Sequence, residues 1–494
     1  MLFNSIEFLY FFPLVVGLYF ILPFRFRWLF LLLASYTFYG LANGLLLLLI
    51  VASTLIDYLA GIKMDDIDTK KGRKPFVILS LISNLGILCL FKYYNFFNDS
   101  FANLFQLLNI PYLIPSLSIA LPVGISFYTF QTMSYSIDVY KGKIKAEKHL
   151  GYFALYVTYF PQLVAGPIEK ASNLLPQFKT KQHFDYKRIT DGLKLMTWGF
   201  FKKVVIADQI SPMIKYVTDS PEQFNGFSVL LCSCLFVYQI YCDFSAYSDI
   251  AIGGAQVMGV KLMENFRRPF FAKSLSDLWS RWHISLINWF QEYIFFPLGG
   301  SKKGRRKAYR NVMIVFLVSG LWHGASYNFL IWGLLNGLVI VLTLRLTKLK
   351  SAANKKVGSF INSVWYRRFL RVKTYIIFAI LGILFYTNDL NSAHLLGESL
   401  FHGWTDDIRG ILMNLENERS HILYLGKSAI QVIALVLAIF ILEWVHYFQE
   451  YNGSMREFVA TKPALVRWLL YIGVTLIIMA FSFDQEIPFI YFQF

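Results

Sequence analysis

Long apolar segments recur along the chain, and they constrain its fold more than any other feature. Early segments of this kind are Ile6–Phe24, Trp28–Gly44, Leu45–Ile62, Phe76–Phe91 and Leu121–Tyr140, and later ones are Tyr375–Tyr386, Ala429–Phe448 and Leu469–Phe483. A helix of about 17 to 25 apolar residues spans a bilayer. Hydrophobic residues make up 56% of the 494, and the mean hydropathy is +0.49. The sequence therefore predicts an all-α polytopic membrane protein with roughly eleven to thirteen membrane segments.

Basic residues are concentrated between the apolar segments, and their positions orient the chain. Arg25–Arg27, Lys63–Lys74 and Lys141–Lys148 alternate with the early spans, and Arg345–Lys373 is basic again. Short loops that are rich in lysine and arginine stay in the cytoplasm. This rule predicts that the N-terminus and residues 484–494 lie outside the cytoplasm. The net charge of +17 fits these loops, so nucleic acid is not an expected partner.

Neither a cleavable leader nor a metal site is predicted. The segment Ile6–Leu22 is long enough to span, and no positively charged residue precedes it, so we expect it to be retained. Four cysteines lie in apolar segments without the spacing of metal ligands: Cys89, Cys232, Cys234 and Cys242. We expect them to be small core residues, with no bound metal or cofactor.

The middle of the chain departs from this regular pattern. Leu150–Pro167 is apolar but contains two prolines, which predicts a broken or re-entrant helix. Arg188–Ile210 mixes basic with apolar residues, as in a segment that lies flat at the membrane interface. Phe227–Met258 carries a polar insertion at 241–249, and charge does not assign its topology.

His323 interrupts apolar sequence inside the block from Asn265 to Gly337. Val312–Leu321 before it and Phe329–Leu344 after it are almost wholly apolar. An ionisable group at membrane depth is costly unless it faces a bundle interior or a water-filled cavity, and it often marks a reaction centre. The alternative is a core histidine that only hydrogen-bonds a neighbouring helix.

A second histidine, His283, lies in an amphipathic segment of the same block. Ser274 to Asp277 resembles a capping box, and apolar residues follow at helical spacing, so we expect one helix that carries both Arg281 and His283. An interfacial helix would show the same pattern. In the other interpretation, Arg281 and His283 face a solvated tunnel. This interpretation is favoured because two of the eight histidines in the chain lie in this one block.

Seven short motifs follow one another along the chain. They are Leu121-Pro-Val-Gly-Ile-Ser-Phe-Tyr-Thr-Phe-Gln131, Leu163-Val-Ala-Gly-Pro-Ile168, Asp243-Phe-Ser-Ala-Tyr-Ser-Asp249, Glu264-Asn-Phe-Arg-Arg-Pro269, Trp279-Ser-Arg-Trp-His-Ile-Ser-Leu286, Pro297-Leu-Gly-Gly300 and Trp322-His-Gly324. In this order they resemble the membrane-bound O-acyltransferase (MBOAT) family, in its bacterial alginate O-acetyltransferase branch. The resemblance covers about residues 1–485, and seven ordered motifs are far more specific than any single one.

The resemblance implies one membrane domain, residues 1–494, built as an MBOAT-type ring of helices around a central tunnel. It implies a catalytic core at about 121–345, additional spans at about 374–483 and an aromatic tail at 484–494. The catalytic histidine of the family maps onto His323, and a second motif histidine maps onto His283. Further positions that bind substrate or line the tunnel are then Arg281, Trp282, Asp243, Trp322 and Asn336. Many relatives have a histidine where this chain has Asn336, so we expect that proton transfer in this chain does not need a histidine at that position.

A histidine suits the reaction that the resemblance implies. An acyl thioester, acetyl-CoA, would come from the cytoplasm, and an acceptor hydroxyl from the other side. A hydroxyl does not attack a thioester unaided near neutral pH, and a histidine with an ordinary pKa of about 6.5 can take its proton as the bond forms. We expect His323 to be the general base, with His283, Asp243 or Asn336 as groups that orient it or hold the oxyanion.

The chain ends in an aromatic tail, Phe489–Phe494, with Tyr491 near its centre. Such residues ordinarily form an aromatic belt at the membrane interface. The tail also resembles a C-terminal motif of related acyl-export systems, in which a tyrosine hydroxyl is thought to receive the acyl group. The resemblance thus implies that Tyr491 is a third catalytic residue, an acyl relay.

The leading hypothesis is an O-acetyltransferase of the bacterial cytoplasmic membrane that serves a cell-surface or exported polysaccharide, alginate-like or peptidoglycan. Its partners would be acetyl-CoA, the polysaccharide, the lipid bilayer and an extracytoplasmic esterase-like (SGNH-type) acyltransferase. D-Alanyl transfer to teichoic acid is the alternative within the family, although those relatives look shorter. A transporter without chemistry is a third interpretation, which is weakened because no inverted repeat is visible.

Overall fold

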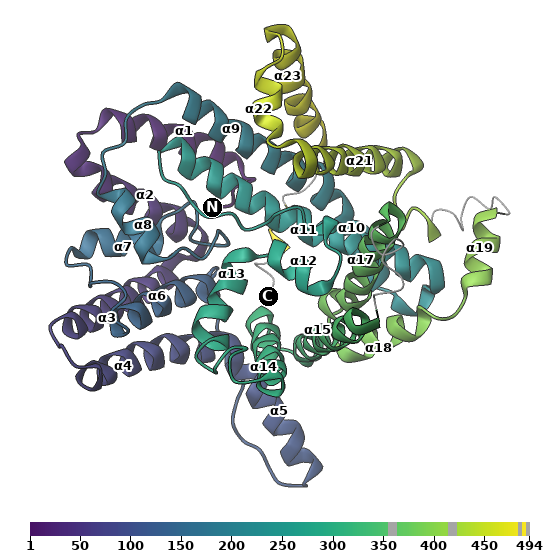
Figure 1. Ribbon diagram of the computed structural model, residues 1–494, viewed down its shortest axis with the longest axis horizontal. Helices are drawn as coiled ribbons and strands as arrows, with labels where there is room; N and C mark the ends of the chain where they lie inside the picture. Colours follow the sequence, from purple (N-terminus) through teal and green to yellow (C-terminus); the bar gives the residue numbers. More distant parts are fainter. Residues whose placement is uncertain (354–362, 413–421, 483–486, 491–494) are drawn as a thin grey trace. The chain divides into compact units, whose positions relative to one another are not determined.

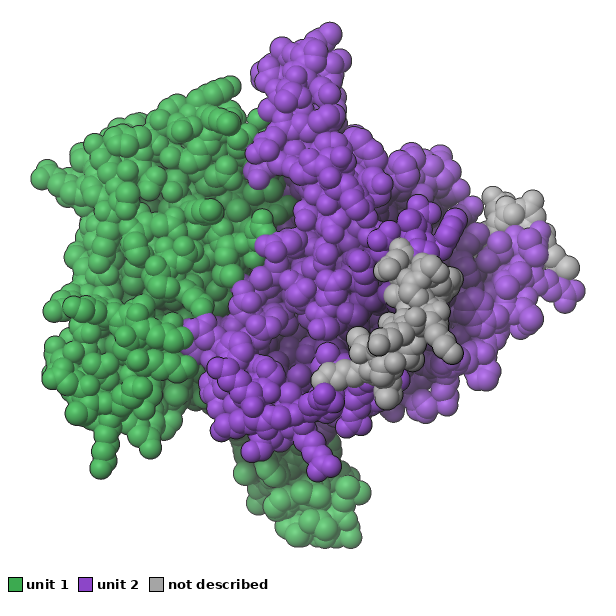
Figure 2. All heavy atoms as spheres, in the orientation of Figure 1, with its two compact units in different colours: residues 1–196, 247–264, 491–494 green, residues 197–246, 265–490 purple. Residues whose placement is uncertain are grey.

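The computed structural model describes residues 1–353, 363–412, 422–482 and 487–490. Of the described residues, 76% are helical and none forms a β-strand, so the predicted all-α class is confirmed. The described residues form two compact units: unit 1 comprises 1–196 and 247–264, and unit 2 comprises 197–246 and 265–490 (Figure 2). The chain changes unit within α9 (Tyr186–Phe200) and within α11 (Gly226–Val257). The single domain with a tunnel stays a prediction.

Unit 1 contains the N-terminal helices. They are α1 (Ile6–Ile21), α2 (Phe24–Asn43), α3 (Leu47–Asp65), α4 (Lys70–Leu88), α5 (Tyr94–Leu107), α6 (Ile125–Tyr140), α7 (Leu150–Thr158) and α8 (Ala171–Phe178) (Figure 1). Helices α3, α4 and α6 pack on one another around Asp57. This buried carboxylate accepts hydrogen bonds from Ser80 Oγ at 2.5 Å, Asn84 Nδ2 at 2.8 Å and Ser136 Oγ at 3.2 Å. Because each helix contributes a group, the cluster ties them together.

Unit 2 contains the helices that follow. They are the π-helical η3 (Phe201–Ala207), α10 (Asp208–Thr218), α12 (Leu275–Arg281), α13 (Ile284–Phe290), α14 (Arg305–His323), α15 (Tyr327–Ala353), α17 (Val364–Tyr386), α18 (Leu390–Ser399), α19 (Trp404–Leu412), α21 (Ala429–Asn452), α22 (Met455–Ala460) and α23 (Ala464–Phe481). Short 3-10 or π segments occur at η1 (Gly44–Leu46), η2 (Cys89–Tyr93), η4 (Pro221–Gln223), η5 (Pro269–Phe271) and η6 (Gln291–Phe295). In unit 2, α15 packs against both α14 and α17, and η3 contacts α21 and α23.

Seven helical runs in the described ranges are long and apolar enough to cross a membrane, which is fewer than the eleven to thirteen segments predicted. They are Phe24–Asp65, Lys70–Leu107, Gly226–Val257, Tyr327–Leu346, Val364–Tyr386, Ala429–Asn452 and Ala464–Phe481. The first run contains α2 and α3, separated by η1, and so corresponds to two predicted segments. Two other predicted spans, α1 and α6, have only 16 residues each. The protein is thus a multi-pass membrane protein, and the number of crossings stays a prediction.

The basic residues just before Tyr375 are helical, so the span that the sequence predicted to begin at Tyr375 begins earlier. Helix α17 begins at Val364, where the Ser363 side chain accepts a hydrogen bond from the Tyr366 amide at 3.1 Å. Arginine and lysine have good helix propensity, and no glycine or proline interrupts the run up to Lys373. Arg367, Arg368 and Arg371 therefore lie on the first turns of a helix.

Three other predictions fall in or near the middle of the chain. The break within Leu150–Pro167 is confirmed, because α7 ends at Thr158 and the buried residues up to Gly166 form turns. Arg188–Ile210 differs from an interfacial segment, since Lys202 and Lys203 are only 2% and 1% exposed. The core interpretation holds for Cys232 and Cys242 but is wrong for Cys89, which is exposed.

Candidate active site

The segment that carries His283 is two short helices, and the prediction of one continuous helix is wrong. Helix α12 ends at Arg281 and α13 begins at Ile284. Between them Trp282 is extended and His283 has a φ of +45°, in the left-handed region. This conformation costs a non-glycine residue about 1–2 kcal/mol. The predicted cap is confirmed, because Ser274 Oγ accepts a hydrogen bond from the Asp277 amide at 3.2 Å.

Residues Asn265 and Arg267 stabilise the break between α12 and α13. The Arg267 amide donates to the Arg281 carbonyl at 2.8 Å, and the Ile284 amide donates to the Asn265 carbonyl at 2.9 Å. Asn265 Oδ1 accepts from the Ser285 amide at 3.2 Å and from Ser285 Oγ at 2.9 Å. Because these bonds satisfy buried backbone groups that a broken helix would otherwise leave unpaired, they hold His283 in place.

Aromatic rings connect His283 with His323. His323 is the last residue of α14, and its ring centroid lies 5.0 Å from that of Trp322, 5.1 Å from Trp332 and 5.2 Å from Phe385. The Trp322 ring also lies 5.6 Å from the His283 ring. The two imidazoles are 1% and 5% exposed, respectively. Unit 2 thus brings three of the predicted residues, His283, Trp322 and His323, into one buried cluster.

His283 lies outside the candidate spans, and its pKa is lowered well below the ordinary range. Burial is the main cause, and the nearby His323 adds to it. Burial disfavours the charged imidazolium because it removes the water that would stabilise the charge. At neutral pH His283 is therefore an uncharged group that can donate one hydrogen bond and accept another.

Glycines let α14 and α15 pack closely just before His323. A Cβ atom on Gly320 would overlap the carbonyl oxygen of Phe329, and one on Gly333 would overlap that of Phe316. Backbone atoms cannot turn away as the end of a flexible side chain can. Small residues allow such close approach in membrane proteins, and here they place His323 against Trp332.

We expect Gly333→Ala to destabilise the protein by about 1–3 kcal/mol, because the added methyl group must push α14 and α15 apart. The measurement is the midpoint of thermal unfolding in detergent. Gly473→Ala in α23 is the matched control, since nothing lies within 4 Å of its added Cβ atom. Equal midpoints for the two variants would show that the close helix contact is not needed.

Asn336 has an unused hydrogen-bond acceptor one turn of α15 away from Trp332. Its Nδ2 donates to the Trp332 carbonyl at 2.9 Å. Its Oδ1 is buried and has no hydrogen-bond partner among the described residues. A buried acceptor without a partner costs about 1–3 kcal/mol. A donor from water or a bound molecule would remove this cost, so Asn336 remains a candidate substrate-binding residue.

Asp243 belongs to a buried charge network in unit 2. Lys203 Nζ lies 2.7 Å from Asp243 Oδ1 and 2.8 Å from Asp208 Oδ1. Asp243 Oδ2 accepts a hydrogen bond from the main-chain amide of Ile490 at 2.5 Å. Lys203 Nζ also lies 4.5 Å from the centroid of the Phe489 ring. This network therefore holds the last described residues of the chain.

The network lies partly in η3 and α10, outside the candidate spans, and its pKa values explain why the lysine stays charged. Burial alone would lower the pKa of Lys203, but Asp243 and Asp208 raise it above the ordinary value. Burial raises the pKa of Asp208 to about 7, although Lys203 opposes this shift. Removing one partner of a buried ion pair typically costs about 3–5 kcal/mol, so this network is also structural.

The other predicted site residues lie in different surroundings. Trp282 is 3% exposed and packs in the core, with ring centroids 5.3 Å from both Phe266 and Phe378. Arg281 is partly exposed and forms ion pairs with Asp277 at 3.0 Å and Glu450 at 3.2 Å. Trp282 therefore supports the cluster from one side, and Arg281 belongs to a separate charged surface.

The sequence prediction for Tyr491 lies outside the described residues. Three residues that shape the site were not predicted, namely Lys203, Asp208 and Asn265. A signal for Lys203 was present, because Lys202 and Lys203 interrupt an otherwise apolar run at 198–207. Asn265 lies in the motif Glu264–Pro269, but its role depends on its partner Ser285, twenty residues further along the chain.

Comparison with known proteins places the chain in one family. The model of "MBOAT, membrane-bound O-acyltransferase family" matches residues 147–370. The chain is 33% identical to "Probable alginate O-acetylase AlgI" of Pseudomonas aeruginosa over 459 residues, which are 92% of this chain and 83% of that protein. It is 36% identical to "Peptidoglycan O-acetyltransferase" of Helicobacter pylori over 338 residues, 63% of each chain. It is 28% identical to "Teichoic acid D-alanyltransferase" of Bacillus subtilis over 232 residues, 44% of this chain and 58% of that protein.

The matched residues include His283, Trp322, His323 and Trp332, whereas Phe385 lies beyond them. The relatives that cover most of the chain are O-acetylases and O-acetyltransferases, as the seven motifs indicated. The chain is therefore a multi-pass membrane O-acyltransferase and belongs to the MBOAT family, in the branch of the alginate and peptidoglycan enzymes.

Proposed function

We propose that this enzyme transfers an acetyl group from cytoplasmic acetyl-CoA for the O-acetylation of a polysaccharide outside the cytoplasm. The observation that carries the proposal is the buried pair of His283 and His323, joined by Trp322, inside the residues that match the family. The names of the relatives support acetyl as the transferred group and alginate or peptidoglycan as the class of acceptor.

His323 is the general base in this proposal. The acceptor oxygen attacks the carbonyl carbon of the thioester while its proton moves to the imidazole of His323. The carbon–sulfur bond then breaks, and the CoA thiolate takes the proton from the imidazolium. The products are an acetyl ester and CoA, and His323 is neutral again. No metal or bound cofactor takes part.

The neighbouring residues position the reactants. The uncharged His283 donates a hydrogen bond to the oxygen of the tetrahedral intermediate, where negative charge develops. The free Oδ1 of Asn336 accepts a hydrogen bond from the incoming hydroxyl. Trp322 and Trp282 exclude water from the thioester, since both are buried among aromatic rings.

Tyr491 is the first acceptor, and it relays the acetyl group onward. Its hydroxyl receives the group by the step described for His323. An extracytoplasmic SGNH-type acyltransferase then passes the group to the polysaccharide. The positive-inside rule supports this path, because it puts both termini outside the cytoplasm and the donor on the other side of the bacterial cytoplasmic membrane. Asp243 contributes by holding the amide of Ile490, the residue before Tyr491.

The donor experiment separates acetyl transfer from D-alanyl transfer. Purified protein in proteoliposomes is given labelled acetyl-CoA or a D-alanyl thioester of a carrier protein, and transferred label is counted. We expect label only from acetyl-CoA. Transfer from the D-alanyl donor alone would replace the proposal with its alternative, which the lower identity and coverage of the D-alanyltransferase disfavour.

The same assay tests His283. We expect His283→Ala to lower the rate of acetyl transfer by about 10²- to 10³-fold, because one oxyanion donor is lost while the base remains. The variant must keep its elution volume in size exclusion. An unchanged rate would reduce His283 to a packing residue.

A further inference from the structure

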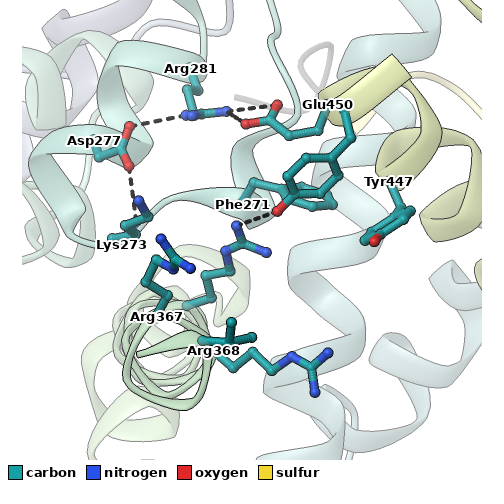
Figure 3. A pocket seen from close by; sticks show the side chains of 11 residues that line it. Phe271, Lys273, Asp277, Arg281, Arg367, Arg368, Tyr447 and Glu450 are labelled. Atoms are coloured by element: carbon teal, nitrogen blue, oxygen red, sulfur yellow. Dashed lines mark hydrogen bonds and ion pairs between the residues drawn. The ribbon is translucent and has the colours of Figure 1, made fainter. Parts of the chain in front are cut away.

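A basic cleft lies in unit 2 beside the end of α12. Its volume is about 480 Å³, and it is lined by α12, the residues just before α12, α17 and α21 (Figure 3). A second hollow of about 280 Å³ shares Asp277, Arg281 and Glu450 with it. Part of the lining, including Arg371, Tyr447 and Glu450, follows the residues that match the family. The cleft therefore includes residues beyond the stretch that the family model matches.

The charges of the cleft are unbalanced. Five cationic side chains line it against two carboxylates, Asp277 and Glu450. Both carboxylates are engaged: Asp277 pairs with Arg281, and Glu450 pairs with Arg281 and with Arg268, the latter at 2.6 Å. In Figure 3, Asp277, Arg281 and Glu450 lie on one side of the cleft, and Arg367 and Arg368 extend from the opposite side. Among the described residues, no carboxylate forms an ion pair with Arg367, Arg368 or Arg371.

Two of the arginines are held in fixed positions. The guanidinium of Arg371 lies 4.8 Å from the centroid of the Phe271 ring, and its Nη2 donates to the Tyr451 hydroxyl at 2.9 Å. Its Nε is buried and makes no hydrogen bond within the described chain. Arg281 is held by its two carboxylate partners. Because these side chains are already held in place, binding a ligand costs little additional side-chain entropy.

We propose that this cleft binds a phosphate-rich group. Arginine forks match phosphate oxygens in geometry, and a surplus of fixed positive charge attracts a group with several negative charges. Two sources carry such a group, namely the nucleotide end of CoA and the headgroup of an anionic phospholipid. If the bound group is the nucleotide end of CoA, the inference rests on the proposed function, because the residues of the cleft then recognise the acetyl donor. Arg281 links the cleft to the reaction centre, because it stands two residues before His283.

The test measures binding without turnover. The full-length protein is purified in nanodiscs of phosphatidylcholine, and titration calorimetry records the binding of CoA and of adenosine 3′,5′-bisphosphate. We expect the double variant Arg367→Gln, Arg368→Gln to bind both ligands at least about tenfold more weakly, because charge-assisted hydrogen bonds are lost. Among the described residues, neither arginine side chain makes a hydrogen bond or an ion pair, and the Arg367 amide, which donates to the Ser363 carbonyl, is kept in the variant, so the variant should fold.

Arg345→Gln is the matched control. Arg345 lies near the end of the candidate span Tyr327–Leu346, and its guanidinium lies 5.2 Å from the centroid of the Tyr309 ring, much as that of Arg368 lies 5.3 Å from the Trp365 centroid. It does not line the cleft. The control removes a positive charge of the same kind, so a loss common to both variants would come from net charge and would overturn the proposal.

A second measurement, on bound lipids, distinguishes the two sources of the phosphate group. Native mass spectrometry of protein purified from the cell membrane records bound phosphatidylglycerol and cardiolipin. Nucleotide binding that depends on Arg367 and Arg368 assigns the cleft to the donor. Lipid retention that depends on them, without nucleotide binding, assigns it to a headgroup. If the double variant equals the parent in both measurements, the cleft binds neither and the inference is overturned.

Kinetics then connect the cleft with the reaction. We expect the double variant to raise the KM for acetyl-CoA about tenfold and to change the KM for acetyl-pantetheine, which lacks the nucleotide, much less. If the parent protein binds CoA but does not transfer acetyl groups, the proposed reaction is wrong and the proposed binding cleft is still supported. If the double variant transfers acetyl groups and the ratio of its KM for acetyl-CoA to its KM for acetyl-pantetheine equals that of the parent, the reaction is supported and the nucleotide site is wrong.

Discussion

The His323→Ala protein is expected to fold and insert in the membrane but to transfer acetyl groups about 10²- to 10⁴-fold more slowly than the parent. This is the usual loss when a general base is removed. The imidazole lies at the end of α14 among three aromatic rings and is 5% exposed, so water cannot easily replace it. The measurement is the single-turnover rate of label transfer from acetyl-CoA to protein or acceptor.

Two controls keep this result interpretable. His394→Ala removes a histidine that is exposed on α18, where it pairs with the exposed Glu398, so the transfer rate of the variant should equal that of the parent. Calorimetry with CoA should show that His323→Ala still binds the donor, since the base is not part of the cleft. A folded His323→Ala protein with the parental rate would rule the residue out as the base.

Tyr491→Phe is expected to abolish delivery of acetyl groups to the polysaccharide. The change removes the one oxygen that would carry the group and keeps the aromatic ring for membrane anchoring. Mass spectrometry of the C-terminal peptide after incubation with labelled acetyl-CoA makes the test direct. We expect label on the tail of the parent, and none on the tail of Tyr491→Phe or of His323→Ala, because the relay needs both the acceptor and the base.

Tyr10→Phe is the matched control for the tail, since Tyr10 is 74% exposed on α1 and loses the same oxygen. Full polysaccharide acetylation by Tyr491→Phe would contradict the relay, and the acceptor would then have to reach His323 directly. Asp243→Asn offers a second check. It weakens the network that holds Ile490, so it should lower tail labelling without removing the acceptor oxygen.

Much of the fold follows from local sequence. Most of the predicted spans coincide with helices because the length and polarity of a segment are properties that neighbours along the chain share. The cap at Ser274 and the break after Thr158 are local too, since each depends on residues a few positions apart. Helix α17 begins before the predicted start at Tyr375, because the arginines and lysines that precede Tyr375 favour a helix as much as apolar residues do.

The sequence alone determined the all-α membrane class, the family and the position of His323 between two apolar segments. Only the tertiary structure decided that α12 stops before His283, because the hydrogen bonds that stabilise the break come from Asn265 and Arg267. It likewise decided that Lys203 is buried, because its partners Asp208 and Asp243 lie on two other helices. Local patterns record which groups are polar, whereas burial depends on partners that only folding brings within hydrogen-bond distance.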